Sequence, residues 1–448
     1  MLRPRWREPA RGRQRAVSGV SATAGGVALA LVVVVLVAAV LLVGGSLLER
    51  RGEQGDGRSQ GGRAAPPATA VVGASLPVWG WETGSAAVAA HAGAFTTASP
   101  QLYEVTEDGG VALRSGLDPE AARTEVLRLR GAGVSVLPTV TNTRDGAWDT
   151  ALAQRVLHDP WLRDRHVVAL VDLVLREDVA GVDVDYEELT AADRTAFSAF
   201  LARLGPALRA HGRLLAVDVF AKDGDAGYDQ RNLAQDYAAI GRAADQVRVM
   251  AYDWHWETSG PGPVAPLDWV ERVVAYAVTQ VPRERLVLGV PTYGYDWAGR
   301  AGQHQGQQQV GGQDQQPGRR AELASWAQAR VRAADRGAPV RWDAQAQSPW
   351  LAYTDTAGEP HELWFEDGRS TAAKLELARR ERLGGVFLWL VGDVDPGTWS
   401  LLEAHRRGDP LVCAPTDAQA GPRADTRTDT RTDTRSDTQD RTDHRDAA

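Results

Sequence analysis

Three acidic side chains alternate with apolar ones along one short segment of the chain. Residues 179–187 are Val-Ala-Gly-Val-Asp-Val-Asp-Tyr-Glu. On a β-strand, alternate side chains share a face, so Asp183, Asp185 and Glu187 point one way and the valines between them point the other. In a parallel barrel, one face of each strand meets the helices and the other faces the interior. We therefore expect the valines to pack against helices and the three carboxyl groups to face the interior.

Carboxyl groups buried this close together cannot all ionise, because burial and mutual repulsion both disfavour the charged form. Glu187 is the last of the three and lies at the carboxyl end of the predicted strand, where the active sites of such barrels open. We predict that Glu187 is a protonated general acid and that a charged Asp185 keeps it protonated. A solvated edge strand and a metal site are the two alternatives. The apolar neighbours argue against the first, and the lack of a nearby histidine or carbonyl-rich loop argues against the second.

Short runs of β-branched and aliphatic residues alternate with longer amphipathic or alanine-rich segments along the chain. Eight of these runs predict β-strands: 76–81, 101–105, 134–140, 179–186, 214–220, 247–252, 286–291 and 385–390. Helix signals lie in the gaps: Asp118 and Pro119 predict a helix start, Gly131 its end, and Thr190 with Asp193 a capping box. Strand and helix alternating eight times predict an α/β fold, the (β/α)8 or TIM barrel.

One gap is too long for an ordinary connection between a strand and a helix. It runs from about residue 298 to 383 and contains a Gln- and Gly-rich stretch, a helical segment near 321–334, and strand-like pieces at 351–353 and 362–365. We predict a small α+β insertion before the last strand. At the mouth of the barrel, such an insertion would form one wall of a cleft.

A long uncharged segment follows a basic N-terminus. Six arginines lie between Arg3 and Arg15, and residues 16–48 carry no charge. A helix needs about 20 apolar residues to span a bilayer, so residues 24–48 predict a transmembrane helix that precedes the barrel. The basic cluster before this segment outweighs the two arginines after it, which favours an N-terminus inside the cell. A cleavable signal peptide and a buried core helix are the alternatives.

These features predict a single-pass protein of the cell membrane with its catalytic domain outside the cytoplasm. Its parts are a basic cytoplasmic segment (1–23), the anchor (24–48), a flexible linker (49–73), the barrel domain (74–410) and a disordered tail of charged repeats (411–448).

The composition narrows the class of ligand. The formal net charge is −8, and no basic patch is interleaved with aromatic residues, so we expect no nucleic-acid partner. The single cysteine, Cys413, provides neither a disulfide framework nor a cysteine cage for a metal. We expect no cofactor, no metal and a monomer. Fifteen tryptophans against six phenylalanines suit a sugar ligand, because indole faces pack on the apolar faces of sugar rings.

The segment around Asp185 resembles the Asp-x-x-Asp-x-Asp-x-Glu signature of glycoside hydrolase family 18, the chitinase-like (β/α)8 enzymes. The resemblance implies that Asp183 is the middle acid, that Asp185 lies beside the substrate acetamide, and that Glu187 is the proton donor. Ala180 stands where the signature has its first acid, and Tyr186 stands where tryptophan is more usual.

Further segments resemble the same family over about residues 74–405. Residues 250–253, Met-Ala-Tyr-Asp, resemble the sixth-strand motif, which implies that the Tyr252 hydroxyl contacts the acetamide. Residues 288–295 resemble the seventh strand and 385–389 the eighth, whose tryptophan forms the floor of a sugar subsite. Asn142 and residues 253–266 are closest to the branch with spore-cortex and cell-wall lytic members. The residues expected to bind substrate are Asp253, Trp389, Tyr293, Asn142 and Trp254.

Structural roles are the alternatives for these aromatic and acidic residues. Trp389 is also compatible with barrel core, because large apolar residues fill barrel interiors. Tyr252 and Asp253 are also compatible with a structural hydrogen-bonded pair.

The resemblance implies hydrolysis of β-1,4 bonds in a polysaccharide with N-acetylglucosamine units, with retention and with the substrate acetamide as nucleophile. Chitin and peptidoglycan both carry this group, and the external location favours peptidoglycan. A chitinase-like glycan-binding protein and a structural envelope protein are the alternatives from other classes.

Overall fold

The structure is a computed structural model that describes residues 70–299 and 320–413. The predicted cytoplasmic segment and membrane anchor lie outside the described residues, as does the predicted tail after residue 413. In the part of the chain that the structure describes, no helix is both long and apolar enough to cross a bilayer.

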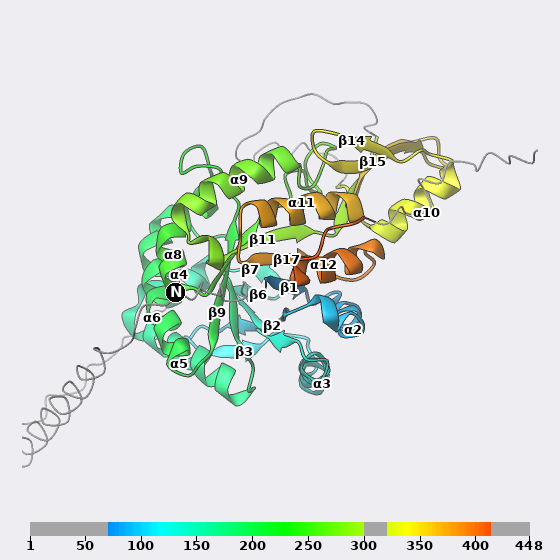
Figure 1. The fold of residues 1–448 in the computed structure, drawn as a ribbon. Coiled ribbons are helices and arrows are strands. Elements are labelled where there is room, and N and C mark those ends of the chain that lie inside the picture. The colour runs from blue at the N-terminus through cyan, green and yellow to red at the C-terminus, as the bar shows by residue number, and fades with distance from the viewer. Residues whose placement is uncertain (1–69, 300–319, 414–448) are drawn as a thin grey trace, which may run out of the picture. The chain divides into compact units, whose positions relative to one another are not determined.

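Eight parallel strands close into a barrel (Figure 1). They are β1 (Val71–Leu76), β2 (Thr97–Val105), β5 (Thr139–Thr141), β8 (Gly181–Asp185), β9 (Leu214–Phe220), β10 (Gln246–Met250), β11 (Leu286–Pro291) and β17 (Gly385–Trp389). Because β1 pairs in parallel with both β2 and β17, the sheet closes on itself. Two short strands, β3 (Val111–Leu113) and β4 (Ser135–Val136), also pair with β2. The predicted (β/α)8 barrel is confirmed.

Helices follow the strands and lie around the outside of the barrel (Figure 1). They are α2 (Trp81–Ala90), α3 (Pro119–Gly131), α4 (Thr150–His158), α5 (Pro160–Arg176), α6 (Arg194–Arg209), α7 (Gln230–Ala234), α8 (Tyr237–Ala243), α9 (Leu267–Gln280), α11 (Gly368–Arg380) and α12 (Gly397–Arg407). The predicted start of α3 is confirmed, because the Asp118 carboxylate accepts the Ala121 N–H at 2.8 Å. Thr190 and Asp193 form the predicted capping box, around the short 3-10 turn Ala191–Asp193 that precedes α6.

The first strand lies earlier in the chain than expected. We predicted a strand at 76–81 after a linker ending at 73, but β1 covers Val71–Leu76 and Trp81 begins α2. The last three linker residues therefore belong to the barrel. Pairing with β2 and β17 on both sides buries residues 72–76, and this tertiary pairing outweighs local strand preference.

The insertion is a separate small sheet with one helix. Its strands are β12 (Tyr293–Ala298), β13 (Glu322–Ser325), β14 (Arg341–Asp343), β15 (Ser348–Thr354) and β16 (Pro360–Trp364), in the order β13-β12-β16-β15-β14, and its helix is α10 (Trp326–Arg336). The predicted bounds of 298–383 were wrong at both ends. The chain leaves the barrel directly after β11, and α11 is a barrel helix that packs against α9, α12, β11 and β17.

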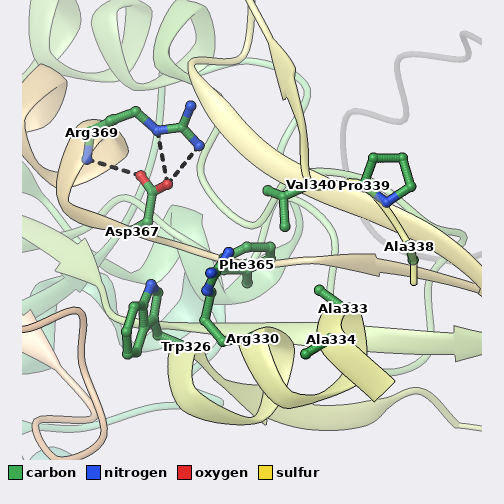
Figure 2. A pocket seen from close by; sticks show the side chains of 10 residues that line it. All are labelled: Trp326, Arg330, Ala333, Ala334, Ala338, Pro339, Val340, Phe365, Asp367 and Arg369. Atoms are coloured by element: carbon green, nitrogen blue, oxygen red, sulfur yellow. Dashed lines mark hydrogen bonds and ion pairs between the residues drawn. The ribbon is translucent and has the colours of Figure 1, made fainter. Parts of the chain in front are cut away.

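A cavity of about 370 Å³ opens beside α10 in the insertion (Figure 2). Trp326, Phe365 and Val340 give it apolar walls. The two cationic groups in its lining are Arg330 and Arg369, and the second is tied to Asp367 by hydrogen bonds of 2.7 and 2.9 Å. None of the predicted site residues lines this cavity, so it is separate from the acidic segment of β8.

Candidate active site

The acidic segment forms β8, which lies between β5 and β9 inside the closed sheet. Val182 and Val184 are fully buried on the side of the helices, and Asp183 and Asp185 are also buried, with exposed fractions of 0% and 4%. As predicted, the carboxyl groups occupy the opposite face from the valines. The alternative of a solvated edge strand is therefore wrong. Glu187 follows the end of β8 and is partly buried.

Tyr186, between two of the acids, points into the helix layer. Its ring stacks on Phe200 of α6, with centroids 5.9 Å apart and an interplanar angle of 3°, and its hydroxyl contacts the buried His166 of α5. Position 180 has the same parity as the valines, so Ala180 leaves the interior set of acids unchanged.

The Asn142 side chain forms hydrogen bonds with both the N–H and the carbonyl group of Glu187. Its Nδ2 donates to the Glu187 carbonyl at 2.9 Å, and its Oδ1 accepts the Glu187 N–H at 2.9 Å. The side chain is fully buried. The prediction that Asn142 contacts substrate is therefore corrected, because its amide is committed to positioning the acid.

Burial raises the pKa of Glu187 to about 8. Arg231 opposes this rise, whereas Glu188, Asp218 and Asp253 add to it. Glu187 therefore holds a proton near neutral pH, as a general acid must. The predicted cause needs correction. The pKa of Asp185 is itself raised well above its ordinary value, first by burial and then by Glu187 and Asp183, so Asp185 is not a fixed charge.

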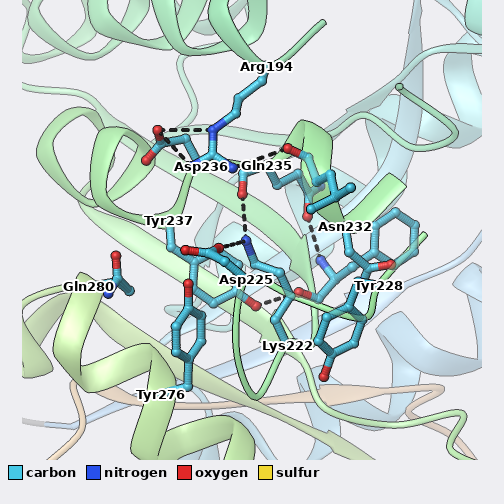
Figure 3. A network of polar contacts seen from close by, with 12 residues as sticks. Arg194, Lys222, Asp225, Tyr228, Asn232, Gln235, Asp236, Tyr237, Tyr276 and Gln280 are labelled. Atoms are coloured by element: carbon cyan, nitrogen blue, oxygen red, sulfur yellow. Dashed lines mark hydrogen bonds and ion pairs between the residues drawn. The ribbon is translucent and has the colours of Figure 1, made fainter. Parts of the chain in front are cut away.

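Hydrogen bonds within the loop after β9 hold this loop in place and position Arg231 near Glu187. Lys222, directly after β9, donates to the Gln235 carbonyl at 2.9 Å and lies 3.4 Å from an Asp225 carboxylate oxygen (Figure 3). The Asn232 amide donates to the Ala221 carbonyl at 3.0 Å. These contacts hold the loop in place, and Arg231 then reaches Glu188 at 3.0 Å.

Aromatic side chains from β12, from β17 and from the segment after β10 lie around Asp253 and Tyr252, which follow β10. The Tyr293 and Tyr295 hydroxyls both donate to Asp253 Oδ1, at 2.5 and 3.3 Å. Burial raises the pKa of Asp253 to about 6. The Tyr252 ring is parallel to the Trp389 indole, with centroids 6.3 Å apart and an angle of 7°. The structure thus connects the predicted residues Asp253, Tyr293, Tyr252 and Trp389 in one group. Asp253 and Tyr252 interact electrostatically with Glu187.

Trp254 packs against the helix layer. Its ring lies 5.0 Å from that of Trp269 in α9, and its backbone N–H donates to the Val264 carbonyl at 2.9 Å. A sugar contact for Trp254 stays a prediction.

Seven non-glycine residues of the described chain have left-handed backbone angles that side chains rarely adopt, and three of them follow barrel strands β8, β10 and β17. These three are Glu188 (φ 55°), Asp253 (φ 55°) and Leu390 (φ 69°). Each adjoins or belongs to the predicted site. Such local strain is typical of functional sites, where the surrounding fold holds the backbone in place.

Several residues of this site were missed by the sequence analysis. Trp79, after β1, is 67% exposed and packs edge-on against Trp389 at 6.1 Å. Asp218 in β9 and Arg248 in β10 face the interior beside the acids and are 6% and 1% exposed. A single charged residue in an otherwise apolar strand was the available signal for both.

One group of possible metal ligands lies in the insertion. Asp355, Glu359 and His361 have ligand atoms within 4.8 Å of one another. The His361 ring also bonds to Asp296 at 2.9 Å. His361 belongs to β16, Asp355 and Glu359 lie in the turn between β15 and β16, and none of the three belongs to the acidic segment of β8.

The chain is similar to proteins of known sequence and structure. It is 35% identical over 305 residues to YdhD, a protein of Bacillus subtilis (strain 168) named as a sporulation-specific glycosylase, covering 67% of this chain and 66% of that protein. It is 30% identical over 270 residues to the cortical fragment-lytic enzyme of the same strain, covering 60% and 59%. The chain thus spans less than two thirds of the length of these two relatives.

A chitinase from Chromobacterium violaceum has a similar solved structure, with a TM-score of 0.66 and 29% identity over 76% of this chain and 100% of that one. The family model for glycosyl hydrolases family 18 matches residues 140–393, which include β8, β10, β11 and β17. This match covers more than half of the chain, and the chain therefore belongs to glycosyl hydrolases family 18, a family of hydrolases.

Proposed function

We propose that this protein hydrolyses β-1,4 glycosidic bonds in polysaccharides with N-acetylglucosamine units. The observation that carries the proposal is Glu187 itself. It follows the carboxyl end of β8, its backbone is fixed by Asn142, and burial raises its pKa to about 8. A carboxyl group in this state can donate a proton to a glycosidic oxygen near neutral pH.

The reaction uses the substrate as its own nucleophile. Glu187 gives its proton to the glycosidic oxygen while the acetamide oxygen bonds to the anomeric carbon and the glycosidic bond breaks. Asp185 orients the acetamide and stabilises the positive charge that develops on it, and the Tyr252 hydroxyl binds its oxygen. Glu187, now a carboxylate, then takes a proton from the water that opens the cyclic intermediate. The configuration at the anomeric carbon is retained.

Peptidoglycan is the substrate that we favour. Both curated relatives bear names that concern sporulation or the spore cortex, and both are at least 30% identical to this chain. The chitinase with a similar structure supports chitin as the second substrate. Both polymers carry the 2-acetamido group that the reaction requires.

The test compares the wild type with Glu187→Gln on purified peptidoglycan, on chitin oligomers and on a plain β-1,4 glucan. Glu376→Gln is the matched control, because Glu376 is exposed on α11. We expect the wild type and the control to release reducing ends from an acetamido polymer, and Glu187→Gln to lose about a hundredfold or more in kcat. Rapid hydrolysis of the plain glucan, or an unchanged rate in Glu187→Gln, would refute the mechanism.

The chitinase-like glycan-binding alternative makes a different prediction. It rests on Trp79 and Trp389, which give the site an aromatic face that suits sugar rings. Binding of chitin oligomers with no turnover in either wild type or Glu187→Gln would favour it.

We also propose that residues 24–48 anchor the protein in the cell membrane with the barrel outside the cytoplasm, and that the protein is a monomer. The uncharged length of this segment and the arginines before it support the anchor. Protease treatment of intact cells tests the orientation, because an external barrel is degraded and a cytoplasmic one is protected. Light scattering of the purified protein tests the monomer.

A further inference from the structure

The barrel interior next to Glu187 holds more carboxyl groups than cations. Asp183 and Asp185 project from β8, Asp218 from β9 and Arg248 from β10. All four are buried, with exposed fractions of 6% or less. A buried carboxylate is costly unless a cation or hydrogen-bond donors compensate its charge. The position of the arginine therefore decides which acid can be charged.

Arg248 reaches across the barrel to Asp183. Asp218 is its direct neighbour in the pairing of β9 with β10, yet the Arg248 guanidinium donates to Asp183 Oδ2 at 3.0 Å. It also donates to Ser99 Oγ at 2.7 Å and to Gln246 Oε1 at 3.1 and 3.2 Å. These four hydrogen bonds, to residues of three strands, fix the position of the Arg248 guanidinium.

Asp183 is the acid best supplied with donors. Its Oδ2 accepts the guanidinium and also the Thr139 hydroxyl, at 2.9 Å. Asp185, by comparison, accepts from the Gln101 amide at 3.5 Å. Burial raises the pKa of Asp183 as well, but Arg248, Thr139 and Ser99 all oppose that rise. Charge-assisted hydrogen bonds stabilise the ionised form of a carboxyl group, so Asp183 is the acid of this set that ionises first.

Three oxygen atoms in this cluster have no hydrogen-bond partner. They are Oδ1 of Asp183, Oδ1 of Asp185 and Oδ1 of Asp218, all buried. Buried polar atoms are almost always paired, so such oxygens call for an explanation. Protonation of a carboxyl group removes the charge that such an unpaired, buried oxygen would otherwise carry.

We propose that Arg248 is a positioning residue that sets the protonation pattern of the catalytic acids, holding Asp183 as the carboxylate while Asp185 and Asp218 hold protons in the resting enzyme. This inference rests on the proposed function for its meaning in catalysis. Of the three acids, Asp183 is the one that accepts a hydrogen bond from Arg248. Asp185 and Asp218 lie near Asp183, whose negative charge disfavours their own ionisation.

Other charged groups near the cluster agree with this pattern. The pKa of Asp218 is raised well above its ordinary value, first by burial and then by Asp183 and Asp185. Arg114 lowers the pKa of Asp185, but burial, the largest cause, together with the neighbouring acids outweighs it. Tyr252 also faces these acids, and burial raises the pKa of its hydroxyl, which stays neutral.

Arg248 then sets the pH range over which the enzyme is active. The transition state needs negative charge among these acids to offset the positive charge that develops on the acetamide. A buried guanidinium makes that charge available at lower pH, because an opposite charge nearby lowers the pKa of a carboxyl group by about 1–3 units.

The first experiment measures kcat/KM against pH for Arg248→Met and Arg248→Lys, on an oligosaccharide that the wild type hydrolyses. Lys374→Met is the matched control, because Lys374 is an equally buried cation, paired with the buried Glu366 at 2.8 Å. We expect the acid limb of Arg248→Met to move up by about one pH unit or more, which is about a tenfold loss on the acid side. Arg248→Lys keeps the charge and restores the limb, and Lys374→Met leaves it unchanged.

A second measurement needs no turnover. Carbon-13 NMR of aspartate carboxyl carbons, with signals identified by Asp183→Asn and Asp185→Asn, follows each acid from about pH 4 to about pH 9. We expect the Asp183 signal of the wild type to stay at its ionised position, and the Asp185 signal to stay protonated at neutral pH. This arm uses the wild type, so it decides the case even if Arg248→Met does not fold.

Two outcomes would overturn the inference. If Arg248→Met loses kcat/KM equally at every pH, Arg248 has a structural role alone. If Asp183 of the wild type is protonated at neutral pH, the proposed protonation pattern is wrong. A wild type that hydrolyses neither polymer would refute the proposed function, whereas the NMR result would still hold or fail on its own.

Discussion

Replacing Glu187 with glutamine should make the folded protein more stable above about pH 5 while it removes activity. Burial raises the pKa of this group from 4.5 to about 8. Between these two values, the unfolded chain has released a proton that the folded protein still holds. The free energy of unfolding therefore falls as pH rises through this window, and it stops falling above about pH 8. Glutamine has no proton to release, so the variant avoids this loss.

The size of the effect follows from the size of the pKa rise. One pKa unit corresponds to about 1.4 kcal/mol, so a rise from 4.5 to about 8 sets an upper limit of roughly 5 kcal/mol. Glu187 keeps some contact with solvent, and its charge is shared with neighbouring acids, both of which reduce the value. We expect a gain of about 2–3 kcal/mol at pH 8 and almost none near pH 4.

Urea unfolding at several pH values measures this difference. The wild type, Glu187→Gln and the exposed control Glu376→Gln are compared at each pH, with the slope of the transition checked for constancy. We expect the curves of the wild type and Glu187→Gln to diverge between about pH 5 and 8, and the control to follow the wild type. Equal stability of wild type and Glu187→Gln at every pH would refute the assignment of a buried, protonated acid at this position.

Three further predictions concern the surroundings of the acid. Arg231→Gln should move the alkaline limb of kcat/KM up by about half to one pH unit, because Arg231 lowers the pKa of Glu187; a pH profile measures it, and a downward shift would contradict it. Asn142→Ala should lower the free energy of unfolding by about 1–3 kcal/mol, because two backbone groups of Glu187 lose their partner, and should lower kcat about a hundredfold. Trp389→Ala in a Glu187→Gln background should weaken calorimetric binding of a chitin oligomer about tenfold, because a stacking face is lost, and unchanged binding would place Trp389 in the barrel core.

The acidic segment could be predicted because its signal is local. Alternation along a single strand fixes which side chains share a face, and the apolar neighbours fix which face meets the helices. Asp183 and Asp185 therefore lie where the sequence places them. The strands 214–220 and 286–291 were also predicted with their observed bounds, because each is a run of mostly apolar residues ended by a clear change in composition.

Contacts between strands could not be predicted in the same way. Ser99, Asp183 and Arg248 come from three strands, separated by as many as 149 residues, and only closure of the barrel brings them together. Asn142 was identified from a motif, but its partner is a backbone group that no side-chain pattern reveals. The end of the linker was misplaced for a related reason, since residues 71–73 become a strand only through pairing with β2 and β17.

The placement of the acids also explains why their cost does not unfold the barrel. Buried acids that lack enough cations and hydrogen-bond donors destabilise a protein, so other interactions must offset their free-energy cost. Val182 and Val184 lie on the opposite face of the same strand, fully buried against a helix layer that includes Phe197, Phe200 and Leu204. Each fully buried side chain of this kind contributes about 1.5–3 kcal/mol. β8 thus carries stabilising residues on its outer face and reactive ones on its inner face. The pKa of Glu187 can therefore be shifted by its surroundings without disturbing the packing of the valines against the helices.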